Sequence, residues 1–262
     1  MRLLDRLWSV RLWSVRLWAV PLMAVAALCV AGDSRSLAKP KPQPFFEFQF
    51  VRLIYTTNPY GYSRGNWLTD WPEAEANLLR GVRRLSRIDI APEGGRVGIM
   101  DDSLFDHPWI YAVEVGGLMF SDAEAKRMRE YFDRGGFLMV DDFHGTAEWK
   151  GFEEAMRKVF PDRRIVEIPV TDPIFNLQFD LDNTIQIPGM AALVRGVTYE
   201  RDGVIPHWRG IYDQRGRLMV VIDFNMDLGD AWENADFPGY DIKYTTRAYK
   251  FAINYMLYAM TH

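Results

Sequence analysis

The pattern of apolar and polar positions along residues 45–262 alternates between strand-like runs and helix-like stretches. One unit is especially clear. A helical period over residues 121–134 ends at two glycines, and the apolar run Phe137–Val140 then leads into two aspartates, a phenylalanine and a histidine. Helix, glycine turn and buried strand follow one another in this way in doubly wound sheets. Further strand-like runs lie at residues 48–57, 96–100 and 109–115.

Capping motifs predict where the helices begin. Asp70 and Glu73 form one D-x-x-E capping box, and Ser121 and Glu124 form a second box of the S-x-x-E type. Each box precedes a stretch with the apolar spacing of an amphipathic helix. A third helix is predicted over residues 146–160, because a proline follows it and ends the helical pattern.

The C-terminal part of the chain has a different pattern. Residues 169–196 are rich in Pro and Asn, show no clear helical period, and are expected to form an insertion or a rim. Residues 207–213 and 217–224 predict a hairpin, and apolar positions over residues 248–259 predict the last helix. The whole pattern predicts one α/β domain over residues 45–262. We expect a three-layer sandwich with a mostly parallel, doubly wound sheet, plus a C-terminal hairpin and helix.

Residues 1–38 have the features of a signal peptide or an N-terminal membrane anchor. Three tandem RLWSV-like units carry its positive charge, and the uncharged run over residues 17–32 would be about 24 Å long as a helix, shorter than a membrane core of about 30 Å. Small residues suited to signal cleavage follow this run. We therefore expect an exported domain, in the periplasm or on the outer face of the cytoplasmic membrane. Residues 39–44 form a proline-rich tether.

Composition excludes several classes of function. Without residues 1–38 the domain keeps 26 basic and 33 acidic residues, a net charge of −7, which disfavours nucleic acid as a partner. Membrane contact is expected only through the N-terminal segment. Cys29 is the single cysteine and lies in that segment. Disulfides, cysteine nucleophiles and zinc-thiolate sites are therefore excluded for the exported domain.

Carboxylates follow three of the predicted strands. They are Asp101 and Asp102, Asp141 and Asp142, and Asp223. If these strands are parallel neighbours, the acids meet at the carboxyl edge, where open α/β sheets bind their ligands. Crowded carboxylates raise one another's pKa or attract a hard cation. Aspartates also cap the turns that follow strands without any functional role, and this alternative stays open.

Asp142 and His144 are the candidate catalytic residues, because an imidazole beside a carboxylate suits proton transfer and metal binding. No fixed ligand spacing accompanies them, so we predict no cofactor other than a divalent cation. The candidate ligand-binding residues are Asp102, Asp141, His207, Arg209, Asp227 and Trp232. Tryptophans exposed beside acids would suit sugar rings, whereas buried ones would belong to the core.

Two local motifs match known patterns incompletely. Residues 61–65 read G-x-S-x-G, but the helix that should follow an elbow directly begins only near Asp70, so this loop is expected to supply aromatic and arginine contacts instead. Residues 223–230 have the oxygen-rich spacing of a calcium loop, but the glycine and terminal glutamate of an EF-hand are misplaced.

Several segments together resemble the bacterial domain-of-unknown-function 4159 family. They are R-L-I-Y from Arg52, Gly116-Gly117, G-G-F-L-M-V-D-D-F-H-G from Gly135, and P-H-W-R-G-I-Y from Pro206 with the N-M-D-L-G-D-A-W-E that follows. This resemblance implies no particular activity. Its architecture looks like the flavodoxin-like sandwich of class I glutamine amidotransferases. Because Asp141, Asp142 and Phe143 stand where true glutaminases have the cysteine elbow, thioester chemistry is not implied.

These observations predict an exported or membrane-tethered domain that binds a ligand at a carboxylate-edged crevice. The partner would be a small ligand, a glycan or a cell-envelope protein. The alternative is a hydrolase, with or without a metal ion, in which Asp142 or His144 acts as the base.

Overall fold

The computed structural model describes residues 46–61 and 66–262, which all belong to the unit Pro44–His262. A seven-stranded sheet lies at its centre, in the order β3-β1-β4-β6-β9-β8-β7. The strands are β1 (Val51–Ile54), β3 (Gly95–Gly98), β4 (Trp109–Val113), β6 (Phe137–Asp141), β7 (Val166–Glu167), β8 (His207–Tyr212) and β9 (Leu218–Phe224). The five strands from β3 to β9 in this order run parallel, and β8 is antiparallel to β9. The predicted mostly parallel sheet and the hairpin are confirmed.

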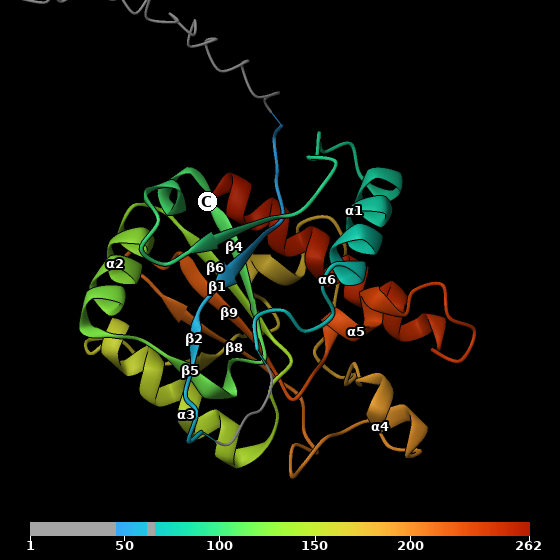
Figure 1. Cartoon of the computed structure of the whole chain (residues 1–262). Helices are drawn as coiled ribbons and strands as arrows, with labels where there is room; N and C mark the ends of the chain where they lie inside the picture. Colours follow the sequence, from blue (N-terminus) through green and yellow to red (C-terminus); the bar gives the residue numbers. More distant parts are fainter. Residues whose placement is uncertain (1–45, 62–65) are drawn as a thin grey trace, which may run out of the picture. The chain divides into compact units, whose positions relative to one another are not determined.

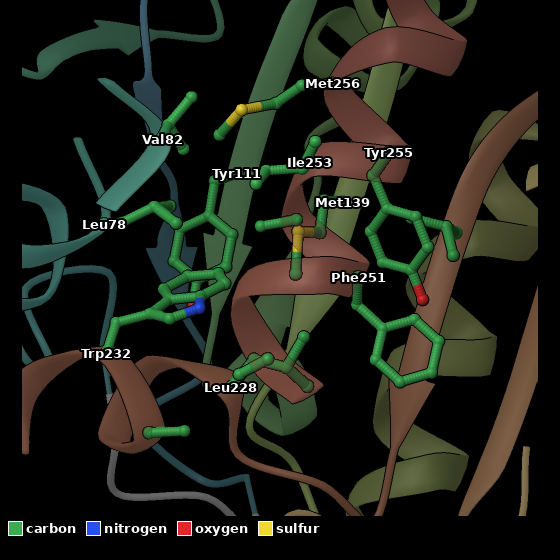
Figure 2. Close-up of a cluster of buried hydrophobic side chains, with 14 of the residues drawn as sticks. Leu78, Val82, Tyr111, Met139, Leu228, Trp232, Phe251, Ile253, Tyr255 and Met256 are labelled. Atoms are coloured by element: carbon green, nitrogen blue, oxygen red, sulfur yellow. The ribbon is translucent and has the colours of Figure 1, made fainter. Parts of the chain in front are cut away.

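Helices cover both faces of this sheet, which gives the predicted three-layer sandwich (Figure 1). One face packs against α2 (Asp122–Asp133) and α3 (Gly145–Val159), and the other against α1 (Glu73–Leu85), α5 (Leu228–Glu233) and α6 (Ile242–Thr261). Neighbouring strand residues point to opposite layers. Ile110 joins the core under α2 and α3, for example, whereas Tyr111 joins the core under α1, α5 and α6. Figure 2 shows the second of these cores, with Tyr111, Trp232 and Phe251 packed between the sheet and the helices.

The helix starts agree with the sequence in one case and differ in another. Ser121 and Glu124 make both hydrogen bonds of the predicted capping box at the start of α2. Asp70 does not cap α1, because Pro72 occupies the capping position and Asp70 turns away with a left-handed backbone, φ 62°. That expectation was wrong. Its physical reason is that Asp70 belongs to a partly buried group of acids described below.

The segment expected to lack helices contains a short one. The helix α4 (Met190–Val194) and a 3₁₀ turn at Pro173–Phe175 lie within residues 169–196. A small antiparallel ribbon, β2 (Thr56–Thr57) with β5 (Leu118–Met119), lies outside the main sheet. The predictions for residues 1–44 and most of the G-x-S-x-G loop fall outside the described residues. None of the helices among the described residues combines the length and the hydrophobicity of a membrane span.

Candidate functional site

The carboxyl ends of the three central strands have an unusual backbone. Glu114, Asp142 and Asn225 come directly after β4, β6 and β9, and all three have left-handed φ values of 57°, 52° and 63°. These strands are neighbours in the sheet, so the three residues lie along one edge. Residues other than glycine adopt this conformation at a cost of about 1–3 kcal/mol each, and such positions concentrate at functional sites. Asn225 is held in place because its Oδ1 accepts from Gly145 N at 2.8 Å.

Asp141 ends β6 and joins the sheet to α5. Its side chain is fully buried, and its Oδ2 accepts hydrogen bonds from the backbone N–H groups of Leu228 and Gly229, both at 2.9 Å, and from the Tyr111 hydroxyl at 3.1 Å. Burial raises the pKa of Asp141 to about 7, although these hydrogen bonds favour its charged form. The other oxygen, Oδ1, has no hydrogen-bond partner among the described residues. Asp141 therefore fixes the start of α5 relative to the end of β6.

Asp142 and His144 form a buried pair. His144 Nε2 lies 3.1 Å from Asp142 Oδ1, and the side chains are 5% and 10% exposed. Burial, followed by the charge of Arg201, lowers the pKa of His144 to about 3. Burial, followed by the repulsion of Glu114 and other acids, raises the pKa of Asp142 well above its ordinary value. At neutral pH the imidazole of His144 is therefore uncharged, and burial favours the uncharged form of Asp142 as well.

Three further acids come together beside this pair. One carboxylate oxygen each from Asp70, Asp227 and Asp230 lie within 4.8 Å of one another. Asp227 Oδ1 caps α5 by accepting from Asp230 N at 2.7 Å, and Asp230 Oδ2 accepts from Met190 N at 2.6 Å. Asp70 Oδ2 is buried and has no hydrogen-bond partner within residues 46–61 and 66–262. Three carboxylates in this spacing offer the oxygen ligands that Ca²⁺, Mg²⁺ and Mn²⁺ prefer.

The charges of these acids are unfavourable without a counter-ion. Burial and then the charge of Asp230 raise the pKa of Asp70 to about 8, and burial and then Asp142 raise the pKa of Asp227 well above its ordinary value. The acids have room because two neighbouring positions, Gly189 and Gly229, have no side chain. A Cβ on Gly229 would lie 2.4 Å from Asp70 Oδ2, and one on Gly189 would lie 2.7 Å from Asp227 Oδ2.

Asp102 lies apart from this group. Its side chain is fully exposed and pairs with Arg127 at 2.7 Å. It follows β3, the edge strand, and β1 and β4 separate β3 from β6. The expectation that Asp102 joins Asp141 and Asp142 was wrong, because it required β3 and β6 to be neighbours in the sheet. The strand order cannot be predicted from the sequence. Asp223 is also absent from the edge, because it lies within β9, fully buried, and accepts from the Tyr255 hydroxyl at 2.9 Å.

Trp232 is a core residue. It is fully buried, and its ring centre lies 5.8 Å from that of Tyr111 (Figure 2). The ring centre of Phe50 lies 6.4 Å away. It therefore offers no exposed ring to a ligand. Trp232 is positioned by α5. Asp141 and Asp227 accept hydrogen bonds from the backbone N–H groups in the first turn of this helix.

His207 and Arg209 lie on the other side of the sheet, next to α3. Both contact Glu167 Oε1, at 2.9 Å and 2.7 Å, and both line a pocket of about 370 Å³ together with Trp149. The residues predicted from the sequence are thus divided between two places. Asp141, Asp142, His144 and Asp227 gather with Asp70 and Asp230 at the carboxyl edge. His207 and Arg209 line the pocket beside α3, which adjoins this edge at Gly145 and Asn225.

Sequence reasoning missed Asp70, Asp230 and Glu114 as members of the edge. Asp70 matched a helix-cap motif, which concealed it. Asp230 belongs to the calcium-like run at 223–230, where only Asp227 and Asp230 come together in space. No local signal marks Glu114, because its position depends on a left-handed turn after β4.

Comparison with known protein families matches residues 49–260 to one family, described as a domain of unknown function (DUF4159). A search of curated proteins finds no match to the chain.

Proposed function

Given that the chain belongs to the DUF4159 family, we propose that its domain binds a ligand at the carboxyl edge of the sheet through a divalent cation held by Asp70, Asp227 and Asp230. The observation that carries this proposal is the convergence of three carboxylate oxygens within 4.8 Å. Asp142 lies close enough to raise the pKa of Asp227. A dication would offset this repulsion and leave coordination positions for oxygen atoms of a ligand.

The position of the site supports a binding function. Open α/β sheets bind ligands beyond the carboxyl ends of their strands. In this domain the three central strands end in residues with a left-handed backbone. Specific contacts, such as the hydrogen bond from Gly145 to Asn225, offset the free-energy cost of that conformation. A scaffold protein would gain nothing from burying so many acids together, because each raises the free energy of the folded state at neutral pH.

The cellular setting follows from the N-terminal sequence. Residues 1–38 export the domain or anchor it, so that it works in the periplasm or on the outer face of the cytoplasmic membrane. Its ligand there is a small molecule, a glycan or a cell-envelope protein. We also propose that the sandwich is of the class I glutamine amidotransferase-like type, in which Asp141, Asp142 and Phe143 stand where true glutaminases have the cysteine elbow.

A hydrolase is the second candidate function, and the Asp142–His144 contact of 3.1 Å favours it. A cation beside Asp142 would stabilise its charged form, and the proton of Asp142 would then pass to solvent, which leaves His144 neutral. His144 would act as the base toward a water molecule activated at the cation.

Thermal unfolding of the full-length chain with CaCl₂, MgCl₂ or MnCl₂ tests the binding proposal. A cation at one hundred times its Kd stabilises by about 2.7 kcal/mol, which corresponds to a rise in Tm of about 5–10 °C for a domain of this size. Asp227→Asn should remove this rise and still cap α5, because asparagine is a good N-cap. Asp102→Asn is the matched control and should keep the whole rise.

The outcomes separate the candidates. A wild-type chain whose Tm responds to none of the three cations contradicts the cation proposal. The hydrolase requires, in addition, turnover of chromogenic esters, phosphates or glycosides that His144→Gln abolishes while the cation response persists. Turnover that is unaffected in His144→Gln excludes the role given to this pair.

A further inference from the structure

None of the three cation-site acids lines the pocket beside α3, although Gly145 and Asn225 of the carboxyl edge do. It measures about 370 Å³, within the range of about 300–1,000 Å³ that is usual for small-molecule sites. Trp149 and Phe224 form apolar walls, and Arg209, His207 and Asp202 supply polar groups. Two of these polar residues come from β8 and one from the loop before it, so separate segments converge on the pocket.

Arg209 is the central group of the pocket. Its guanidinium lies 4.2 Å from the centre of the Trp149 ring and 5.3 Å from that of Phe224, which fixes its plane. Its Nε donates to Glu167 Oε1 at 2.7 Å. Neither of its terminal nitrogens has a hydrogen-bond partner in the described part of the chain. An arginine held in this way presents a two-pronged donor that matches a carboxylate.

His207 adds an acceptor next to this donor. Its Nδ1 lies 2.9 Å from Glu167 Oε1, and its ring stacks on Phe224 with centroids 5.9 Å apart. Burial and the charge of Arg209 lower its pKa, so the ring is neutral at pH 7. With Nδ1–H directed at Glu167, Nε2 keeps a lone pair for a hydroxyl group of a ligand.

Asp202 and Trp149 complete the set. Asp202 accepts from Thr146 N at 2.9 Å at the mouth of the pocket, and its exposed carboxylate can also accept from a hydroxyl group. Trp149 is half-buried and offers part of its apolar surface. Planar polar side chains around an aromatic ring suit a compact molecule with several hydroxyl groups and one negative charge.

From this arrangement we infer that the pocket lined by Trp149, His207 and Arg209 binds an acidic sugar, with its carboxylate on Arg209 and a ring hydroxyl on His207. This site is independent of the cation site, which lies beside α5. A sugar ligand would therefore bind on the α3 side of the domain.

Isothermal titration of the full-length chain with glucuronate tests the inference, with glucose and acetate as the comparison probes. Glucuronate should bind at least about tenfold more tightly than either probe, because only glucuronate uses both Arg209 and the hydroxyl acceptors. Arg209→Gln should weaken glucuronate about tenfold or more and leave glucose unchanged. Arg215→Gln, in the exposed turn between β8 and β9, is the matched control and should bind as the wild type does.

The design separates this inference from the proposed function. Titrations in EDTA and with Asp227→Asn should give the same glucuronate affinity, since neither touches the pocket beside α3. Equal affinities for glucuronate and glucose, or no binding of glucuronate to a folded wild-type chain, overturn the inference. Loss of glucuronate binding in EDTA would also overturn it, because the sugar would then bind through the cation at the carboxyl edge.

Discussion

Replacing Asp70 by asparagine should make the protein more stable at alkaline pH. The Asp70 carboxylate makes no hydrogen bond with the rest of the described chain, its Oδ2 is buried, and it lies within 4.8 Å of oxygens of Asp227 and Asp230. Burial and then the charge of Asp230 raise its pKa from 3.8 to about 8. Asparagine has nearly the same shape and carries no charge, so Asp70→Asn removes the electrostatic penalty and keeps the packing.

The direction of the pH dependence follows from the raised pKa. The folded state holds the Asp70 proton more tightly than the unfolded chain does. Its contribution to stability is therefore complete below about pH 4 and is lost as the pH rises to about 8. At about 1.4 kcal/mol for each pH unit, the full penalty has an upper bound of about 6 kcal/mol. Water entry and relaxation around a buried charge reduce it, and we expect a gain of about 2–4 kcal/mol for Asp70→Asn at pH 8 and almost none at pH 4.

Urea unfolding of the full-length chain, followed by tryptophan fluorescence in EDTA at pH 4, 6 and 8, measures this difference. Asp102→Asn provides the control, because Asp102 is exposed and should show no measurable change at any of the three values. A destabilising effect of Asp70→Asn at pH 8, or an equal effect at pH 4 and pH 8, would refute the reasoning. The first result would mean that the surroundings of Asp70 favour its charged form, and the second that the effect does not arise from a raised pKa.

Three other variants or conditions test the same picture. The affinity for divalent cations should rise about tenfold per pH unit up to about pH 8, because Asp70 must release its proton before it binds the cation. Calorimetric titrations in buffers of different ionisation enthalpy should detect the released proton. Gly229→Ala should abolish the cation-induced rise in Tm and leave a folded protein, because its Cβ would lie 2.4 Å from Asp70 Oδ2; an undiminished rise contradicts the site. Arg52→Met should lower the free energy of unfolding in urea by about 3–5 kcal/mol, because it leaves Glu75 buried without its ion-pair partner at 2.5 Å and leaves the carbonyls of Trp67 and Thr69 without their donor. Adding Glu75→Gln should recover part of this loss, and no recovery would count against the ion pair as the cause.

The site could be predicted from the sequence only in part. Asp141, Asp142 and His144 follow an apolar strand directly, so their place at its carboxyl end is a local consequence of the chain order. Asp70 is different, because a D-x-x-E motif describes a helix cap and a buried cluster member equally well. Its role depends on a left-handed backbone and on Arg52, whose guanidinium donates to the carbonyls of Trp67 and Thr69 in the preceding loop.

The helices, the strands and the α/β class could be predicted from the amino-acid sequence. The sequence predicted the helical and strand periods, the Ser121 capping box and the hairpin, because each depends on residues close together in the chain. Which carboxylates lie together depends on how the strands are ordered in the sheet. The strand order β3-β1-β4-β6-β9 places two strands between the one that precedes Asp102 and the one that precedes Asp142. The alternation of side chains across the sheet directs His207 and Arg209 to the α3 face. Such neighbours are separated by many residues along the chain, and their meeting is fixed by the packing of whole layers and not by any local pattern.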